Sequence, residues 1–452
     1  MKTYLVTDYG VVPDGEPVQT EAIQKVIDRC FREDGGEVVF PAGKYLTGGL
    51  ILKSNVTLKL LSGATIKGTR NREDYFSWKA DPDFAIGEDE LSDSIWQPNH
   101  GQPDRTIPWV THPGTSWNNG LIRAYRAENI AVIGEEGSVL DGSDCYDPEG
   151  EECYRGPHGI DLWYCKNVRF EGYTIQNTGN WAHAVFGCEN IVMSRVTALA
   201  GHDGIHMTSC KNVSITDCGF YTGDDCIAGI ANLNVYVADC VINSACSAFR
   251  FGGTNLFAER CRIYGPCRYY FRGTLSLEDK INGGTPHPDG NRTNMLSVYT
   301  YYADKSFPIP VEPGNIVISD CEIENADRFL HYNFSGNETW QRACPLSSVQ
   351  FQKIRAKGIG MPLTAWGAEE LPFTLTFKDS EISFRDGCEA VPFLQCCHAE
   401  RIRLSGLKIR GCAVDPFILS WEKEPPVTME NVDTEGEAVI RYTEQPFVCR
   451  PI

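Results

Sequence analysis

The chain has 452 residues, of which 42% are hydrophobic and 22% are charged, and its 43 glycines and 25 prolines are scattered rather than clustered. This length exceeds that of one ordinary globular core and predicts either several domains or one elongated repeat protein. The formal net charge of −19 argues against nucleic acid as a partner and disfavours anionic membrane surfaces, because both require a basic footprint. An acidic sugar fits this charge only if its binding pocket is locally basic.

The start of the chain predicts a strand. Residues Met1 to Val6 contain neither the apolar core of a signal peptide nor a small-residue cleavage site. No apolar stretch approaches the ~20 residues that span a bilayer. We therefore expect a cytoplasmic protein that does not associate with membranes. The 19 cysteines are expected to be reduced and buried, because several recur at one position of a repeat and none forms a metal-type CxxC pair.

Residues Thr20 to Phe31 predict an amphipathic helix. Apolar side chains recur there at helical spacing, which places them on one face. The ends of a repeat protein must be covered, because an open end exposes unpaired strand edges, so we expect this helix to cap the first repeat. The apolar positions are Ala22, Ile23, Val26, Ile27 and Cys30.

The central part of the chain repeats about every 22 residues. An asparagine followed by Ile or Val recurs, and each copy begins a short alternating apolar segment that ends in a turn. No repeat has room for a helix of normal length, so the pattern predicts a right-handed, single-stranded parallel β-helix whose coils pair about 4.8 Å apart. The asparagines are expected to form a side-chain ladder. They are Asn129, Asn167, Asn190, Asn212, Asn234 and Asn315.

We expect residues 1–452 to form one β-helix domain. Two stretches, near 71–115 and 275–295, break the rhythm of the repeat and are predicted to be long excursions from it. Excursions from a rigid scaffold often wall a binding cleft. The C-terminal third contains no motif that indicates chemistry and is expected to add further coils and an end cap.

The repeat brings three aspartates together. Residues 22 apart lie above one another in such a fold, so Asp203 is predicted to stack on Asp225, and His202 on Asp224. Carboxyl groups so close raise at least one pKa, which leaves one of them protonated near neutral pH. Glycoside hydrolysis needs one protonated and one ionised carboxyl group. The neighbouring coils are expected to place Trp181, His183, His206 and Arg250 on the same narrow strip of the β-helix surface.

Other interpretations of these residues are open. An Asp–Asp pair in a turn is often only a solvated turn, and Trp181 could belong to the core instead of stacking on a sugar. His202 and His206 could bind a metal together with the aspartates, although the sequence favours a site without metal or cofactor. His158 and Arg272 are further candidates near the strip.

Several motifs resemble a known family. The run from Thr7 to Gly15 and the run from Gly35 to Tyr45 look like the opening of pectin-degrading β-helix proteins. The segment from Asn177 to Ile230 resembles family 28 glycoside hydrolases, the polygalacturonase family, which carry Asn-Thr-Asp, Gly-Asp-Asp, Gly-His-Gly and Arg-Ile-Lys motifs. The resemblance implies that Asp224 is the general acid and that Asp203 and Asp225 activate water.

The chain departs from the family pattern at four places. One is His206, which stands where the family usually has another aspartate. The first motif is Gly201-His202-Asp203, the sequence Ser247-Ala248-Phe249 stands where the family histidine is expected, and no Arg-Ile-Lys is present. Arg272 is expected to lie near the place of that last motif. Beyond the three catalytic aspartates, the residues expected to bind substrate are Trp181, His183, His202, His206, Arg250 and Arg272.

The resemblance implies an inverting glycosidase that cleaves an O-glycosidic bond in a pectin-derived or related oligosaccharide, with exo-action as the expectation for a cytoplasmic enzyme. A polysaccharide lyase or uronate epimerase is a second hypothesis, because His202, His206 and Arg250 could support proton abstraction next to a carboxylate. A carbohydrate-binding β-helix without activity is a third. The sequence does not set the oligomeric state.

Overall fold

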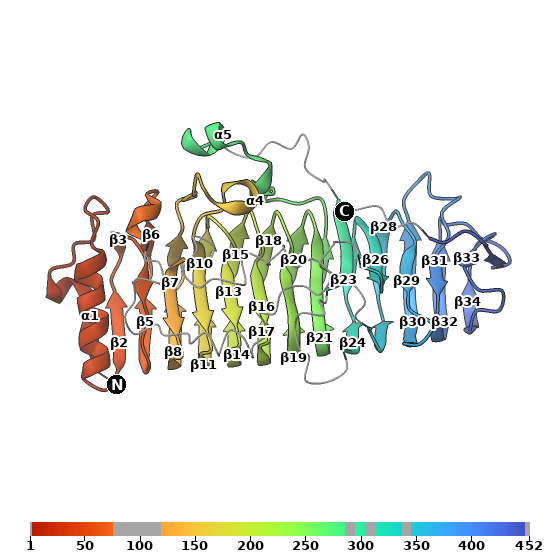
Figure 1. The fold of residues 1–452 in the computed structure, drawn as a ribbon, viewed down its shortest axis with the longest axis horizontal. Helices are drawn as coiled ribbons and strands as arrows, with labels where there is room; N and C mark the ends of the chain where they lie inside the picture. Colours follow the sequence, from red (N-terminus) through yellow and green to blue (C-terminus); the bar gives the residue numbers. More distant parts are fainter. Residues whose placement is uncertain (1, 76–118, 285–293, 303–312, 337–344, 448–452) are drawn as a thin grey trace.

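The computed structural model is an elongated parallel β-helix (Figure 1). It describes residues 2–75, 119–284, 294–302, 313–336 and 345–447. In this part of the chain, 35 strands form one continuous sheet, and every strand-to-strand pairing is parallel. The predicted fold class, a right-handed parallel β-helix, is confirmed by this topology and by the similarity to solved structures described below.

The strands form three stacks, and each coil contributes one strand to each stack. The stack that bears the site contains β4 (Leu50–Ile51), β7 (Gly120–Tyr125), β10 (His158–Trp163), β13 (His183–Phe186), β16 (Ile205–Thr208), the first part of β19 (Ile227–Ala238) and of β21 (Ser247–Glu259), β23 (Met295–Tyr301), β26 (Ala326–Asn333), β29 (Leu363–Trp366), β31 (Leu394–Cys397), β33 (Ile418–Ser420) and β35 (Ile440–Tyr442). The second stack contains β1 (Thr3–Leu5), β2 (Gly36–Phe40), β5 (Val56–Leu60), β8 (Glu128–Gly134), β11 (Lys166–Glu171), β14 (Glu189–Ser194), β17 (Lys211–Thr216), the second part of β19 and β21, β24 (Gly314–Ser319), β27 (Ser348–Gln352), the first part of β30 (Phe373–Phe384) and of β32 (Ala399–Arg410), and β34 (Val427–Asp433). The third contains β3 (Gly43–Thr47), β6 (Ala64–Gly68), β9 (Val139–Asp141), β12 (Thr174–Gln176), β15 (Thr197–Ala200), β18 (Gly219–Thr222), β20 (Val241–Ser244), β22 (Arg262–Tyr264), β25 (Glu322–Glu324), β28 (Arg355–Ile359) and the second part of β30 and β32.

The asparagine ladder holds the second stack in register. Asn212 donates to Asn190 Oδ1 at 3.2 Å, and Asn234 donates to Asn212 Oδ1 at 3.0 Å. These residues adopt left-handed backbone angles, with φ of 57–59°, which asparagine tolerates better than most side chains. The ladder also includes Asn55 and Asn255, which lie outside the repeats that the sequence made recognisable.

Helix α1 (Thr20–Arg32) covers the N-terminal end of the coil stack, as predicted. It buries Ile23, Val26, Ile27 and Cys30, whereas Ala22 is only partly buried. No disulfide occurs among the described cysteines, and all of them except Cys153 and Cys246 are buried. No helix of the described chain is long and apolar enough to cross a membrane.

Two short segments stand above one edge of the coils. Helix α4 (Glu151–Tyr154) lies between β9 and β10, and the turn η5 (Arg272–Thr274) leads into α5 (Leu277–Ile281) after β22 (Figure 1). The sequence predicted the excursion with α5 but not the one with α4. Most of the predicted excursion at 71–115 lies outside the described residues; its first part forms the turn η2 (Arg72–Asp74).

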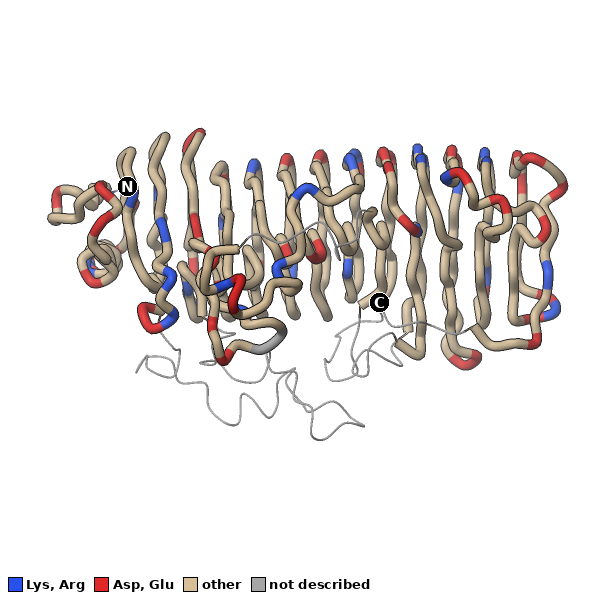
Figure 2. Tube along the Cα trace, turned by 90° about the horizontal axis from the view of Figure 1, so that it is seen from above, with Lys and Arg blue, Asp and Glu red and all other residues tan. Residues whose placement is uncertain are grey.

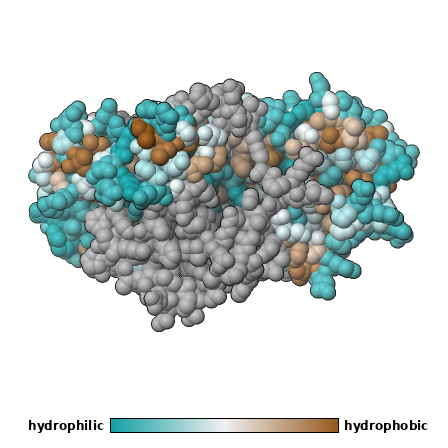
Figure 3. Space-filling view, turned by 45° about the horizontal axis from the view of Figure 1, so that its top comes forward, coloured by the Kyte–Doolittle hydropathy of each residue, from teal (hydrophilic) through white to brown (hydrophobic). Residues whose placement is uncertain are grey.

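Charged residues of both signs are distributed along the whole length of the β-helix (Figure 2). On the face shown in Figure 3, hydrophilic and hydrophobic residues are mixed over the described surface toward both ends. Among the described residues, acidic side chains therefore occur on many elements and not on one alone. That the domain is single stays a prediction.

Candidate active site

The candidate site lies at the turns that lead into the first stack. Backbone hydrogen bonds fix the register there: Gly204 N–H donates to the carbonyl of Asp225 at 3.0 Å, and Cys226 N–H donates to that of Ser247 at 3.0 Å. Together with the pairing of Ile205 with Ile227, they set a step of 22 residues between neighbouring coils. The predicted stacking of Asp203 on Asp225 follows this register.

Two columns of side chains result from this register. The first column is Asn180, His202, Asp224 and Cys246, and the second column is Trp181, Asp203, Asp225 and Ser247. Their members differ in chemistry from coil to coil, unlike the asparagine ladder.

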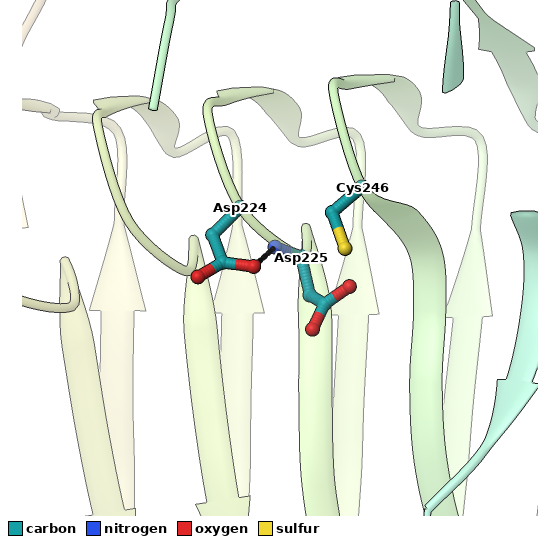
Figure 4. Close-up of side chains that lie close together, drawn as sticks. All are labelled: Asp224, Asp225 and Cys246. Atoms are coloured by element: carbon teal, nitrogen blue, oxygen red, sulfur yellow. Dashed lines mark hydrogen bonds between the residues drawn. The ribbon is translucent and has the colours of Figure 1, made fainter. Parts of the chain in front are cut away.

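Asp224 and Asp225 lie next to Cys246 (Figure 4). The N–H of Asp225 donates to Asp224 Oδ1 at 3.1 Å, and one ligand atom from each of the three side chains lies within 4.8 Å of the others. Such a set could hold a cation, since carboxylate and thiolate are both metal ligands. Burial and the two carboxylates raise the pKa of the Cys246 thiol well above its usual value, so the thiol is neutral near pH 7.

Asp203 is buried against an aromatic stack. His206 Nδ1 lies 2.8 Å from Asp203 Oδ2, and the His206 ring stacks on Trp181 with centroids 3.8 Å apart. Burial first, and then the charges of Asp224 and Asp225, raise the pKa of Asp203 well above its usual value. Burial and Asp224 also raise the pKa of Asp225, to about 6. Asp203 thus favours its protonated form near neutral pH, which is the condition that the sequence predicted for an acid/base site.

Each of the paired aspartates has a cationic neighbour. Arg155 Nη2 lies 3.7 Å from Asp224 Oδ2, and Arg155 Nη1 donates to Asn180 Oδ1 at 3.0 Å. Arg250 Nη1 lies 3.6 Å from Asp225 Oδ2, and its guanidinium sits 4.4 Å from the ring centre of Tyr302. These contacts orient both carboxyl groups, and the charge of Arg250 opposes the rise in the pKa of Asp225.

Sequence reasoning missed three members of the site. Asn180 and Cys246 keep the 22-residue step and could have been found by extending the column by one coil on each side. Arg155 follows α4 and has no place in the repeat, so no periodic signal could have indicated it.

The structure corrects the expectations for three residues. His183 points into the interior of the coil, where its ring nitrogens contact the Tyr173 hydroxyl at 2.8 Å and the Gly204 carbonyl at 2.9 Å, so it cannot bind substrate. The reason is the register: His206 pairs with Ala184, which puts His183 on the inward face of its strand.

Trp181 is only 4% exposed, because the rings of His206 and His158 stack on it at 3.8 and 5.1 Å. It therefore belongs to the support of Asp203 and is not a sugar platform. His206 is likewise buried, and it contacts Asp203 instead of the open site.

The remaining candidates divide into two groups. Arg250 is 26% exposed at its side chain and lies beside Asp225, in a position that a substrate could reach. His202 and Arg272 are buried and line a separate pocket next to the aspartates.

The fold and the aspartate cluster define a polygalacturonase-like β-helix, and comparisons with known proteins agree. Residues 106–245, which include all three aspartates, match the family model of glycosyl hydrolases family 28. Residues 4–103 match the model described as rhamnogalacturonase A/epimerase, pectate lyase-like. The predicted resemblance to family 28 is thereby confirmed.

Particular relatives share parts of the chain. This chain is 47% identical over 254 residues to an exo-poly-alpha-D-galacturonosidase of Dickeya chrysanthemi. The match covers 50% of this chain and 41% of that protein. It is 26% identical over 235 residues to a probable polygalacturonase of Vitis vinifera, covering 49% and 43%. The chain thus spans less than half the length of these two relatives. A crystal structure of an exopolygalacturonase from Thermotoga maritima shares the fold, with a TM-score of 0.61 at 18% identity over 96% of this chain and 91% of that one.

Proposed function

We propose that the chain is a glycosidase that hydrolyses an O-glycosidic bond in a pectin-derived oligosaccharide. The observation that carries the proposal is the cluster of Asp203, Asp224 and Asp225 on neighbouring coils, in which burial and mutual repulsion raise the pKa of Asp203 and Asp225. Glycoside hydrolysis requires such a division between a protonated acid and an ionised carboxylate.

The geometry supports distinct roles for the carboxyl groups. Asp224 has the more open side chain, 20% exposed, whereas the side chains of Asp203 and Asp225 are 6% and 2% exposed. Asp224 is therefore the group that reaches the leaving oxygen, which agrees with the acid role that the resemblance implies. Asp203 and Asp225 then hold the attacking water.

Neighbouring residues complete this mechanism. His206 fixes the orientation of Asp203 through its 2.8 Å contact, and Trp181 fixes the His206 ring. Arg155 and Arg250 lie 3.7 Å from Asp224 and 3.6 Å from Asp225, and their charges oppose the rise in the pKa of Asp203. Attack by water on the face opposite the leaving group inverts the anomeric centre.

Exo-action on short chains is the second part of the proposal. The 47% identical segment of the Dickeya chrysanthemi exo-poly-alpha-D-galacturonosidase supports it. The excursions with α4 and α5 also support it, because Arg155, which follows α4, contacts Asp224, and Arg272, which precedes α5, contacts Gly201. They close one end of a cleft, and a closed end admits only the terminus of a chain.

The test is turnover of a panel of acidic and neutral oligosaccharides by wild type and by Asp224→Asn. We expect one acidic oligosaccharide to release reducing sugar from its end, with an inverted anomer detected by NMR, and the variant to lose most of that rate. An unsaturated product that absorbs in the ultraviolet would instead establish a lyase. Binding of a glycan with no turnover, and with equal affinity in the variant, would establish a carbohydrate-binding protein.

A further inference from the structure

The C-terminal coils carry exposed charges of alternating sign on the outer face of the third stack. The charges occupy one position on β22, β25, β28, β30, β32 and β34, and each residue is paired in register with the next. These strands belong to the C-terminal part of the ribbon in Figure 1. We call this set the charge column; in chain order it contains Arg262, Glu322, Arg355, Glu381, Lys408 and Asp433.

A flanking column stands two residues further along the same strands. It contains Glu324, Lys357, Ser383 and Arg410, which are likewise paired in register. The two columns border a trough of about 460 Å³, whose lining includes residues of both. A flat partner that approaches this face therefore meets the two columns of side chains before it meets the backbone between them.

Within one chain, the alternation pairs residues of neighbouring coils. Arg355 Nη2 lies 2.7 Å from Glu322 Oε1, and Lys408 Nζ lies 3.9 Å from Glu381 Oε1. These four side chains are 54–71% exposed, so water screens the pairs and they contribute little to the stability of the fold. Each charge still faces solvent on its outer side, where a partner of opposite charge can approach it.

The two columns are nearly neutral, although the chain is strongly acidic. Together they contain five cationic and four anionic side chains, whereas the formal net charge of the chain is −19. Two copies of an acidic chain repel each other in solution. A face on which positive and negative side chains alternate is a place where two such copies can come together, provided that opposite charges meet.

The charge column is complementary to itself when it is turned end for end. A two-fold axis that runs parallel to the strands, midway between β28 and β30, reverses the order of the column in a second copy. Because the column has an even number of alternating charges, every charge then meets an opposite one, and the flanking column adds a further pair. The pairs between the two copies are Arg262 with Asp433, Glu322 with Lys408, Arg355 with Glu381, and Glu324 with Arg410.

The order of the charges selects this symmetry. A two-fold axis along the column would place every charge opposite its own copy, so that like charges would meet at all six coils. In a two-fold interface the same surface is used by both copies, and it must therefore be complementary to itself. The end-for-end arrangement meets that condition in both columns.

We propose that this face binds a second copy of the chain, so that the protein forms an antiparallel, two-fold symmetric dimer through its C-terminal coils. The copies overlap over the six coils from Arg262 to Asp433, a length of roughly 24 Å. Asp203, Asp224 and Asp225 lie on coils that precede this overlap, so the dimer leaves the candidate active site open. The proposal does not depend on the proposed glycosidase function.

A short charge column on the second stack provides the comparison. Lys211 Nζ lies 3.3 Å from Glu189 Oε1 there. The outward residues beside these two include Val192 and Ser214, which carry no charge, so the alternation is one residue wide. It is explained by contacts between coils of one chain. The short charge column contains Glu128, Lys166, Glu189 and Lys211.

The test measures the mass of the full chain by sedimentation and light scattering at about 0.15 M ionic strength. We expect the 50.3 kDa chain to form a dimer. Arg355→Glu and Glu381→Arg should each weaken the dimer at least about tenfold, because each creates two like-charge contacts at the centre of the two-fold interface.

Mixing the two variants distinguishes the dimer contact from effects within a chain. In a mixed dimer the two substituted side chains face each other with opposite charges, and Arg355 of one variant faces Glu381 of the other. The mixture should therefore form a heterodimer about as tight as the wild-type dimer. Repulsion within each chain is the same in the mixture as in the single variants, so a change in folding cannot cause this recovery.

Lys211→Glu is the control, because it reverses an exposed charge in the short charge column and should leave the dimer unchanged. A wild-type chain that stays monomeric at every concentration measured would overturn the proposal. So would a mixture of the two variants that does not associate, or a loss in Lys211→Glu as large as that in Arg355→Glu.

Discussion

The asparagine ladder and the first column use the same step along the chain in opposite ways. Asn190, Asn212 and Asn234 repeat one residue, and each amide donates to the next in a chain of hydrogen bonds. The first column places four different residues at the same step. Identical neighbours stabilise the solenoid, because each satisfies the next, whereas unlike neighbours bring groups of different pKa and charge together.

The chain separates stability from chemistry by position within the coil. Its ladders lie at the turn into the second stack, and its ionisable groups lie at the turn into the first. In the second column, this arrangement destabilises the ionised carboxylates. Asp203 and Asp225 are buried carboxyl groups with raised pKa values. Changes in the columns should therefore affect turnover most, and changes in the ladder should affect stability most.

The largest effect is expected for Asp203→Asn. The amide cannot exchange the proton that the cluster needs, so kcat should fall by roughly 10²- to 10⁴-fold, the usual contribution of general acid–base catalysis. Steady-state kinetics on the oligosaccharide found by the panel measures it. Asp217→Asn is the matched control, because Asp217 is an exposed aspartate in a turn of the next coil. A similar loss of kcat in Asp203→Asn and Asp217→Asn would show that the two columns are no more important for turnover than other turns of the coil.

Asp225→Asn should change how stability depends on pH. The folded pKa of Asp225, about 6, lies above the ordinary value of 3.8, so the folded state holds a proton between these values. This favourable contribution is full below about pH 4 and is lost as pH rises through about 6. The asparagine variant should thus gain on wild type by on the order of 2 kcal/mol between pH 4 and pH 7. Denaturant unfolding at both pH values measures it, and a constant difference would contradict the raised pKa.

Asn212→Ala should lower stability and leave kcat unchanged. The variant loses the hydrogen bonds to Asn190 and Asn234. It also places alanine at φ 57°, a left-handed conformation that alanine tolerates less well than asparagine. We expect a loss of about 2 kcal/mol from these effects together. Asn212→Gly separates them, since glycine adopts this conformation without strain and keeps only the loss of hydrogen bonds. A large fall in kcat of folded Asn212→Ala would show that ladder and site are coupled.

The smallest effect is expected for Arg155→Gln. Arg155 opposes the burial and repulsion that raise the pKa of Asp203, and it lies beside Asp224. Removing this charge should lower kcat about tenfold, as for a lost charge-assisted hydrogen bond, and move the pH profile to higher pH. Arg155→Lys should restore the position of the profile. An unshifted profile in Arg155→Gln would mean that Arg155 acts only in folding.

The coil, the cap helix and the contact between the aspartates could be predicted from the amino-acid pattern alone. A parallel β-helix stacks residues at a fixed step, so the spacing between Asp203 and Asp225 already implied contact. The asparagine copies and the apolar face of α1 were local patterns of the same kind.

The neighbours that face the aspartates could not be predicted in this way, because they depend on the folded arrangement. Strand alternation sent His183 inward, ring stacking buried Trp181 and His206, and α4 delivered Arg155 from outside the repeat. The excursion after β22 placed Arg272 over Gly201. These outcomes depend on the direction of side chains and on the path of irregular segments, which a repeat period does not encode.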